Sequence, residues 1–183
     1  MKKGTLAALS LSALLLAGCG GKSAEAGKDG KDTATVAVKP YADPKMEMKY
    51  SARLAGKDYS VTIKREADPS QPVVQDELGH EFYDNRVTVT ILRDGAAFSE
   101  ATYTKDSFRE FLTATDSKGS VLLGMAFDPD RSDSHAIRLV SQVGQPGIEE
   151  GPSFVIEIPL DGGAASILRD KRQDTTKEDM MGD

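Results

Sequence analysis

The sequence has few of the residues on which several classes of binding and catalysis depend. It has one cysteine, Cys19, so an intramolecular disulfide and a zinc site built from several thiolates are excluded. It has no tryptophan and few other aromatic residues, which argues against a sugar-binding platform of stacked rings. Lysine and arginine are scattered among acids, as in Lys28-Asp29, and the formal net charge is −6. Because phosphate contacts need clustered cations, we expect no nucleic acid partner.

The longest apolar run is too short to cross a membrane in the mature protein. It extends from Leu6 to Leu16, whereas a spanning helix needs about 20 apolar residues. Lys2 and Lys3 precede it and small residues follow it, an order typical of an export signal. The segment after it resembles the lipobox of bacterial lipoproteins, with Leu16, Ala17, Gly18 and Cys19 in succession.

The lipobox resemblance implies both an anchor and a location. Residues 1–18 would be removed as a signal peptide, and Cys19 would carry fatty chains that attach the protein to a membrane. Removing 18 of the 183 residues leaves 165, and the loss of Lys2 and Lys3 changes the net charge from −6 to −8. We therefore expect a lipid-anchored protein of the bacterial cell envelope, in the outer membrane and facing the periplasm. A chance cysteine after an ordinary signal peptide is the alternative.

Composition divides the mature chain into a tether, a domain and a tail. Residues 19–43 contain little that could be buried, so we expect a flexible tether after the lipidated cysteine. Residues 44–169 alternate between apolar and polar side chains, which predicts a single β-rich domain. Residues 170–183 are largely charged and are predicted to be a polar disordered tail.

The period-two pattern predicts seven to eight antiparallel strands and an all-β fold class. The apolar positions that carry this pattern fall in residues 46–54, 59–63, 87–91, 98–103, 121–127, 137–143, 154–160 and 166–168. Asp94-Gly95 suits the positive φ angles of a tight hairpin turn. A small barrel and a sandwich both satisfy the pattern, and we favour a barrel-like meander.

One short helix is predicted near residues 105–113. Phe108, Phe111 and Leu112 have the spacing that places side chains on one face of an α-helix. Thr104 or Asp106 can cap its first turn by accepting a hydrogen bond from a free backbone N–H. We expect two to three turns that cover one end or flank of the sheet structure.

The segment 76–85 is the densest polar and aromatic stretch of the chain. Its weak candidates for a binding loop are Asp76, Glu77, His80, Tyr83 and Asp84. Together with Glu81, its acids could offer oxygen ligands to a hard cation. The spacing of an EF-hand loop is missing, however, and a plain turn with local Asx hydrogen bonds explains the same residues. We therefore predict no metal site.

No catalytic constellation is evident. Asp128, Asp130 and Asp133 form a second acidic loop, but Arg131 within it favours a solvated turn over a cation site. His80 and His135 are the only histidines, and neither belongs to a zinc motif. The sequence also has no nucleophile elbow of the G-x-S-x-G type and no phosphate-binding loop. We therefore predict no catalytic residue, no cofactor and no enzymatic activity.

The order of several features resembles an uncharacterised family of bacterial lipoproteins, domain of unknown function 4738. The residues that carry the resemblance are Asp76-x-x-Gly79, Phe82-Tyr83-Asp84-Asn85, and then Lys105-x-x-Phe108 after a hydrophobic strand. It would cover residues 45–170. It implies a lipid-anchored domain of gut-type bacteria with no assigned activity, and it supplies no catalytic residue.

These features favour a non-enzymatic binding or interaction module held on the envelope by its lipid. Its partner would be another envelope protein or a small apolar ligand. Met46, Met48 and Tyr50 would line an apolar pocket in that case, or belong to the core. A carrier with its ligand in a barrel cavity and an envelope hydrolase with a dispersed active site are the alternatives.

Overall fold

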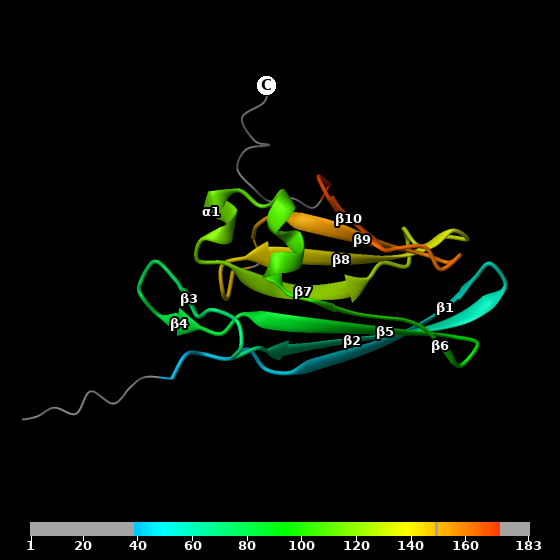
Figure 1. Ribbon diagram of the computed structural model, residues 1–183, viewed down its shortest axis with the longest axis horizontal. Helices are drawn as coiled ribbons and strands as arrows, with labels where there is room; N and C mark the ends of the chain where they lie inside the picture. Colours follow the sequence, from blue (N-terminus) through cyan, green and yellow to red (C-terminus); the bar gives the residue numbers. More distant parts are fainter. Residues whose placement is uncertain (1–38, 149, 173–183) are drawn as a thin grey trace, which may run out of the picture. The chain divides into compact units, whose positions relative to one another are not determined.

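The computed structural model describes residues 39–148 and 150–172, which form two four-stranded antiparallel sheets and a short hairpin (Figure 1). The first sheet has the order β1-β2-β5-β6 and contains β1 (Met46–Leu54), β2 (Lys57–Ala67), β5 (Asn85–Arg93) and β6 (Ala96–Tyr103). The second has the order β10-β9-β8-β7 and contains β7 (Val121–Phe127), β8 (Ala136–Gly144), β9 (Ser153–Pro159) and β10 (Ser166–Arg169). The hairpin consists of β3 (Val74–Gln75) and β4 (Glu81–Phe82).

The two larger sheets enclose one hydrophobic core. Val61 and Ile91 face inward from the first sheet, Leu139 and Ile156 face inward from the second, and all four are fully buried. Residues between them along each strand are more exposed, as the alternating burial of β5 and β9 shows. This is the pattern expected when each sheet buries one face.

The all-β class is confirmed, and the architecture is a sandwich. The expectation of a barrel-like meander is wrong, because segment 104–120 carries the chain from β6 to the second sheet and β7 pairs with β8 alone in the part of the chain described. A period of two indicates only that one face of each strand is buried. A barrel and a sandwich both produce this period. The sequence pattern therefore could not separate them.

The predicted helix is present but differs in type. Residues Lys105–Phe111 form the 3-10 helix η1, and a separate short helix, α1 (Ala114–Ser117), follows it. In a 3-10 helix the i and i+3 positions eclipse, so Phe108 and Phe111 both reach Phe154 of β9, with ring centroids 4.7 and 6.1 Å away. Thr104 precedes the helix, and its N–H donates to the Ser107 hydroxyl at 3.1 Å. Thr104 therefore occupies the cap position, but this hydrogen bond is made by its backbone N–H and not by its side chain.

The structure extends the domain slightly beyond both predicted boundaries. Tyr41, placed in the tether by the sequence, pairs with Phe82 of β4. Asp170, placed in the tail, is buried and forms a 2.5 Å ion pair with Arg131. The predicted signal peptide, the lipobox and Cys19 lie outside the described residues. Among those that are described, no helix combines the length and apolar character needed to cross a bilayer.

Candidate functional site

A cleft opens between the β3–β4 hairpin and the η1–α1 segment, which lie at the same end of the molecule (Figure 1). Its volume is about 430 Å³. One wall comes from the residues that lead into and form β3, and the other from the two short helices and the turn after them. The lining residues are Gln71, Pro72, Val73, Val74, Gln75, Glu81, Asp84, Lys105, Asp106, Ser117, Lys118 and Gly119.

A second hollow of about 700 Å³ adjoins this cleft and shares Gln75, Lys118 and Gly119 with it. The two walls come closest at Gly119, where an added Cβ would lie 3.2 Å from the Gln75 carbonyl oxygen. Gly119 also has a φ of +67°, a conformation that other residues rarely adopt. Glycine at this position therefore allows the turn after α1 to lie against β3.

Asp84 lies at the base of the cleft and is only 4% exposed. Its Oδ1 accepts hydrogen bonds from the backbone N–H groups of Leu122, at 2.8 Å, and Asn85, at 2.7 Å. These bonds tie the start of β5 to the start of β7 and fix the direction of the carboxylate. Burial raises the pKa of Asp84, while the two N–H groups and Lys105 act in the opposite direction.

Lys105, the first residue of η1, faces Asp84 across a gap. Its Nζ donates to the Ser120 carbonyl at 2.6 Å and to the Ser117 carbonyl at 3.4 Å, which directs the ammonium group along the cleft wall. The distance from Nζ to Asp84 Oδ2 is 3.7 Å, longer than a direct hydrogen bond. A polar atom beside this pair, off the line that joins Nζ and Oδ2, could lie within hydrogen-bond distance of both.

The polar network continues from the cleft to the edge of the sandwich. Asn85 Nδ2 donates to Asp43 Oδ2 at 2.8 Å and to the Leu122 carbonyl at 2.9 Å. Arg65 Nη1 donates to the Leu123 carbonyl at 2.5 Å and lies 3.9 Å from Asp43. The first residues of β5 and β7 are thus held by side chains as well as by packing.

The five candidate residues from segment 76–85 do not form a single site in the structure. Asp84 lines the cleft, whereas Asp76 and Glu77 line the neighbouring hollow. His80 is exposed, and its Nδ1 lies 2.8 Å from Asp76 Oδ2. Tyr83 is half-buried, and its N–H donates to the Tyr41 carbonyl at 2.9 Å on the edge of β4 away from β3.

Asp76 organises the hairpin turn. It accepts hydrogen bonds from the N–H groups of Leu78, at 2.9 Å, and His80, at 2.8 Å. Desolvation acts to raise the pKa of Asp76, but the side-chain and backbone hydrogen bonds of His80 and Leu78 outweigh it and hold the pKa below its usual value. The Asp76 carboxylate therefore stabilises the turn through these hydrogen bonds.

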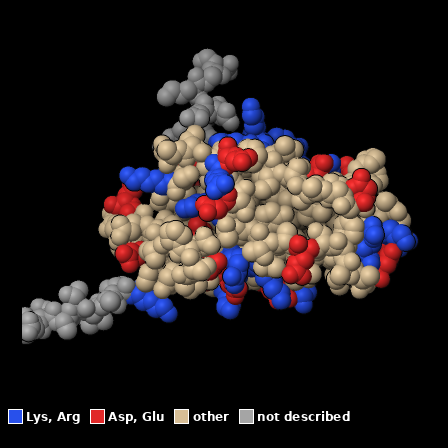
Figure 2. Space-filling view, in the orientation of Figure 1, with Lys and Arg blue, Asp and Glu red and all other residues tan. Residues whose placement is uncertain are grey.

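The acids of the two loops do not converge on a common centre. Among residues 39–148 and 150–172, no group of three or more histidine, cysteine, aspartate or glutamate side chains could hold a metal ion. Asp128 pairs with Arg131, and Asp133 pairs with Arg138 at 2.9 Å. His135 is exposed, and its backbone N–H donates to Asp133 at 2.8 Å. Figure 2 shows positive and negative side chains interspersed over the visible face.

Most residues that line the cleft are not among the site candidates from the sequence, and Lys105, Gln75 and Gly119 are three of them. In the sequence Lys105 belongs only to the helix motif, and no motif includes Gln75 or Gly119. They come from segments that are far apart in the chain and share no local motif. Only the fold brings them to Asp84, so nothing in the spacing of the sequence could have connected them.

The family described as Domain of unknown function (DUF4738) matches residues 28–163. The chain belongs to this family. The DUF4738 match includes every residue that lines the cleft and extends from upstream of β1 to just beyond β9. A search of the curated proteins finds no match. The family description assigns no activity.

Proposed function

We propose that this DUF4738 protein is a lipid-anchored, non-enzymatic binding module of the bacterial envelope, and that its cleft takes a small neutral ligand bearing hydroxyl groups. The observation that carries the ligand assignment is the 3.7 Å separation of Asp84 Oδ2 and Lys105 Nζ on the cleft wall. A hydroxyl oxygen beside the pair, within hydrogen-bond distance of each, would donate to the carboxylate and accept from the ammonium group.

The charges of the cleft support a neutral ligand. Glu81, Asp84 and Asp106 line it together with Lys105 and Lys118, so neither sign dominates. An added anion or cation would be repelled by one partner of the Asp84–Lys105 pair. A neutral hydroxyl keeps both charges paired and satisfies both hydrogen-bonding groups.

The remaining lining residues suit a ligand with both polar and apolar parts. Gln71, Gln75 and Ser117 offer further hydrogen-bonding groups, while Pro72 and Val73 offer an apolar wall. This arrangement holds a hydroxyl-bearing ligand by hydrogen bonds and not by ring stacking. It favours a polar ligand at the surface over an apolar ligand in the interior, where the space between the sheets is occupied by buried side chains.

The lipid anchor is supported by the sequence from Lys2 to Cys19. If Cys19 carries fatty chains, Cys19→Ser will accumulate as an uncleaved or soluble form, because the acceptor thiol is gone. The measurement is membrane fractionation together with intact mass. Normal processing and membrane retention of Cys19→Ser would show that the anchor is assigned to the wrong residue.

The cleft is tested by titration of the isotopically labelled protein with glucose, followed by NMR. Glucose at about 10 mM, a concentration suited to millimolar dissociation constants, should shift the amide signals of Val74 and Gly119. Glucosamine and glucose 6-phosphate, which add a charge to the same ring, should shift them less.

Two variants control this titration. Lys105→Met keeps most of the side-chain length but removes the ammonium group, and it should abolish the shifts. Lys57→Met removes an exposed lysine that pairs with Asp94 in a distant hairpin turn, and it should leave the shifts unchanged. Equal glucose shifts in wild type and Lys105→Met would refute the assignment.

A further inference from the structure

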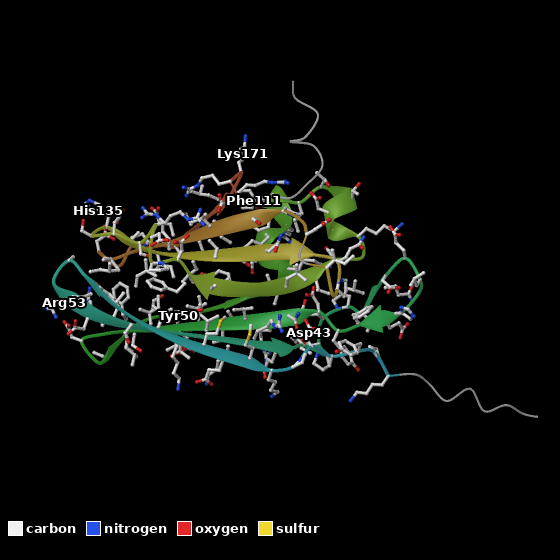
Figure 3. All side chains as sticks on the ribbon, turned by 180° about the vertical axis from the view of Figure 1, so that it is seen from behind. Asp43, Tyr50, Arg53, Phe111, His135 and Lys171 are labelled. Carbon is white, nitrogen blue, oxygen red and sulfur yellow. The ribbon has the colours of Figure 1, made fainter. Side chains whose placement is uncertain are left out.

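β1 is an outer strand of the first sheet. It pairs along its whole length with β2, and in the part of the chain that is described no strand pairs with its other edge. In Figure 3, Tyr50 and Arg53 show the course of β1 along the lower side of the molecule. A free edge of nine residues presents a row of backbone donors and acceptors with which another strand can pair.

The edge of β7 differs, because side chains close it at its start. The Leu122 N–H donates to Asp84, and the Leu122 carbonyl accepts from Asn85. The Leu123 carbonyl accepts from Arg65. Among residues 39–148 and 150–172, no side chain forms such a bond with the backbone of β1. β1 therefore keeps its outward backbone groups available to a partner.

The hydrogen bonds of Asp58 show which residues of β1 have outward backbone groups. Arg53 lies opposite Asp58 in the β1–β2 ladder. The Asp58 carbonyl accepts from the Asp94 N–H at 2.7 Å, and the Asp58 N–H donates to Asp94 Oδ1 at 3.1 Å. Because both backbone groups of Asp58 point away from β1, Arg53 is in a pair without ladder hydrogen bonds, and its own groups point outward. This direction alternates along the strand, so the outward set is Glu47, Lys49, Ser51 and Arg53.

A second copy of β1 matches this set in an antiparallel arrangement centred on Tyr50. Glu47 and Arg53 are equally distant from Tyr50, so each lies opposite the other in the second copy, and Lys49 lies opposite Ser51. Every outward backbone group then meets another outward group, as an antiparallel ladder requires. All nine residues of each strand gain a partner.

The side chains of the outward set favour this register over its neighbours. They are exposed, and the register forms two symmetry-related pairs of Glu47 with Arg53. A shift by two residues places Lys49 opposite either Lys49 or Arg53, and like charges directly opposite each other destabilise a strand pair. A shift by four or more leaves at least four residues of each strand unpaired.

Arg53 can accommodate the additional carboxylate. Its side chain is 70% exposed and pairs with Asp58 at 2.8 Å. A guanidinium group has five N–H donors, so a second carboxylate can bind beside the first.

The inward face of β1 is self-complementary in the same register, with Met46 opposite Leu54 and Met48 opposite Ala52. Met46 is 37% exposed, and it lines with Met48 a groove of about 450 Å³ beside β7. Four further side chains pack against the core and remain partly exposed, namely Met48, Tyr50, Ala52 and Leu54. Pairing with a second copy would therefore remove apolar surface from water.

We propose that the protein forms a symmetric dimer in which β1 pairs antiparallel with β1 of a second copy about Tyr50. The two first sheets then join into one continuous sheet of eight strands. A two-fold axis relates the copies, so each contact occurs twice. The dimer does not involve the ligand assigned to the cleft, since no residue of β1 lines that cleft.

Sedimentation equilibrium of the full chain in a density-matched detergent tests the pairing. Glu47→Arg places an arginine opposite Arg53 twice, and it should raise the dimer dissociation constant about tenfold or more. Arg53→Glu should do the same, because it places an acid opposite Glu47. The combined variant restores opposite charges and should return the constant to within about threefold of wild type.

Glu100→Arg is the matched control. It makes the same change of charge at an exposed position of β6, the other outer strand of the first sheet, and it should leave the dissociation constant unchanged. Glu47 and Arg53 are also exposed, so each variant should keep the circular dichroism spectrum of wild type.

Three results would overturn the proposed dimer. One is a wild-type chain that stays monomeric up to about 0.5 mM. Equal dissociation constants in wild type, Glu47→Arg and Arg53→Glu would place the contact on another surface. Failure of the combined variant to restore association would show that the two residues do not face each other.

Discussion

Asp84 shows how a single buried carboxylate can serve both the fold and a binding site. One oxygen is used by the backbone N–H groups of Leu122 and Asn85, and the other faces Lys105. Burial raises the pKa of Asp84 because it disfavours the charged form, whereas the two N–H groups and Lys105 favour that form. The same carboxyl group thus holds two strand ends together and lines a cleft.

Substitution of Asp84 should separate these two roles. Asp84→Ala leaves two buried N–H groups without an acceptor and should lower the free energy of unfolding by about 3 kcal/mol. Asp84→Asn keeps an oxygen for both N–H groups and should cost about 1 kcal/mol. Urea unfolding at neutral pH measures both. Equal losses in the two variants would show that the backbone hydrogen bonds do not account for the stability of this region.

Asp133 should make the stability of the protein depend on pH in the acid range. The Arg138 side chain and the N–H groups of His135 and Ala136 lower the pKa of Asp133 from 3.8 to about 2. A depressed pKa contributes stability that is complete above 3.8 and is lost as the pH falls through about 2.

Asp133→Asn removes this contribution at every pH. The difference in urea midpoint between wild type and Asp133→Asn should therefore narrow as the pH is lowered from about 4 to about 2. A difference that stays constant across this range would mean that Asp133 is not ionised preferentially in the folded state.

At the scale of elements, the sequence predicts the strands better than the connections between them. Alternation of apolar and polar residues indicates most strands of the two sheets, because one face of each strand is buried, whereas β7 is indicated by an apolar run and β10 by a short segment after a glycine turn. It missed β3 and β4, since two residues are too few to show a period. Phe108, Phe111 and Leu112 indicated a helix, but the same apolar residues also fit a 3-10 turn followed by a separate α-turn.

Gly119 tests whether the walls of the cleft are in close contact. Gly119→Ala imposes a positive φ on alanine and places its Cβ 3.2 Å from the Gln75 carbonyl. Gly79 has a φ of +82°, and no atom lies within 4 Å of an added Cβ. Gly79→Ala therefore measures only the free-energy cost of a positive φ for alanine. We expect Gly79→Ala to cost about 1 kcal/mol and Gly119→Ala about 1 kcal/mol more. Thermal unfolding compares them, and equal costs would contradict the contact.

At the scale of the whole molecule, the fold class follows from the pattern but the architecture and the site do not. The sandwich arises because segment 104–120 crosses between sheets and packs Phe108 over Phe154, a contact between residues far apart in the sequence. The cleft likewise joins residues 71–84 to residues 105–119. The polar residues around Asp84 in the sequence indicate that it is a candidate site residue. Its proximity to Lys105 cannot be predicted from the sequence, because only the fold brings the two residues together.

The end of the domain provides a prediction at the same scale. Asp170 donates its backbone N–H to Ser153 at 2.7 Å and pairs with Arg131, so it fastens the end of β10 to the rest of the sandwich. A chain that ends at Arg172 should unfold like the full chain. A chain that ends at Arg169 should lose about 2 to 4 kcal/mol, because Arg131 then lacks one of its partners. Denaturant unfolding compares the two, and equal stability would place the boundary before Asp170.

A crystal structure of the protein soaked with glucose tests most directly whether Asp84 and Lys105 together bind a hydroxyl group. We expect a sugar oxygen within about 3 Å of both Asp84 Oδ2 and Lys105 Nζ. A structure in which Nζ contacts Oδ2 directly, with the sugar bound elsewhere or not at all, would contradict it.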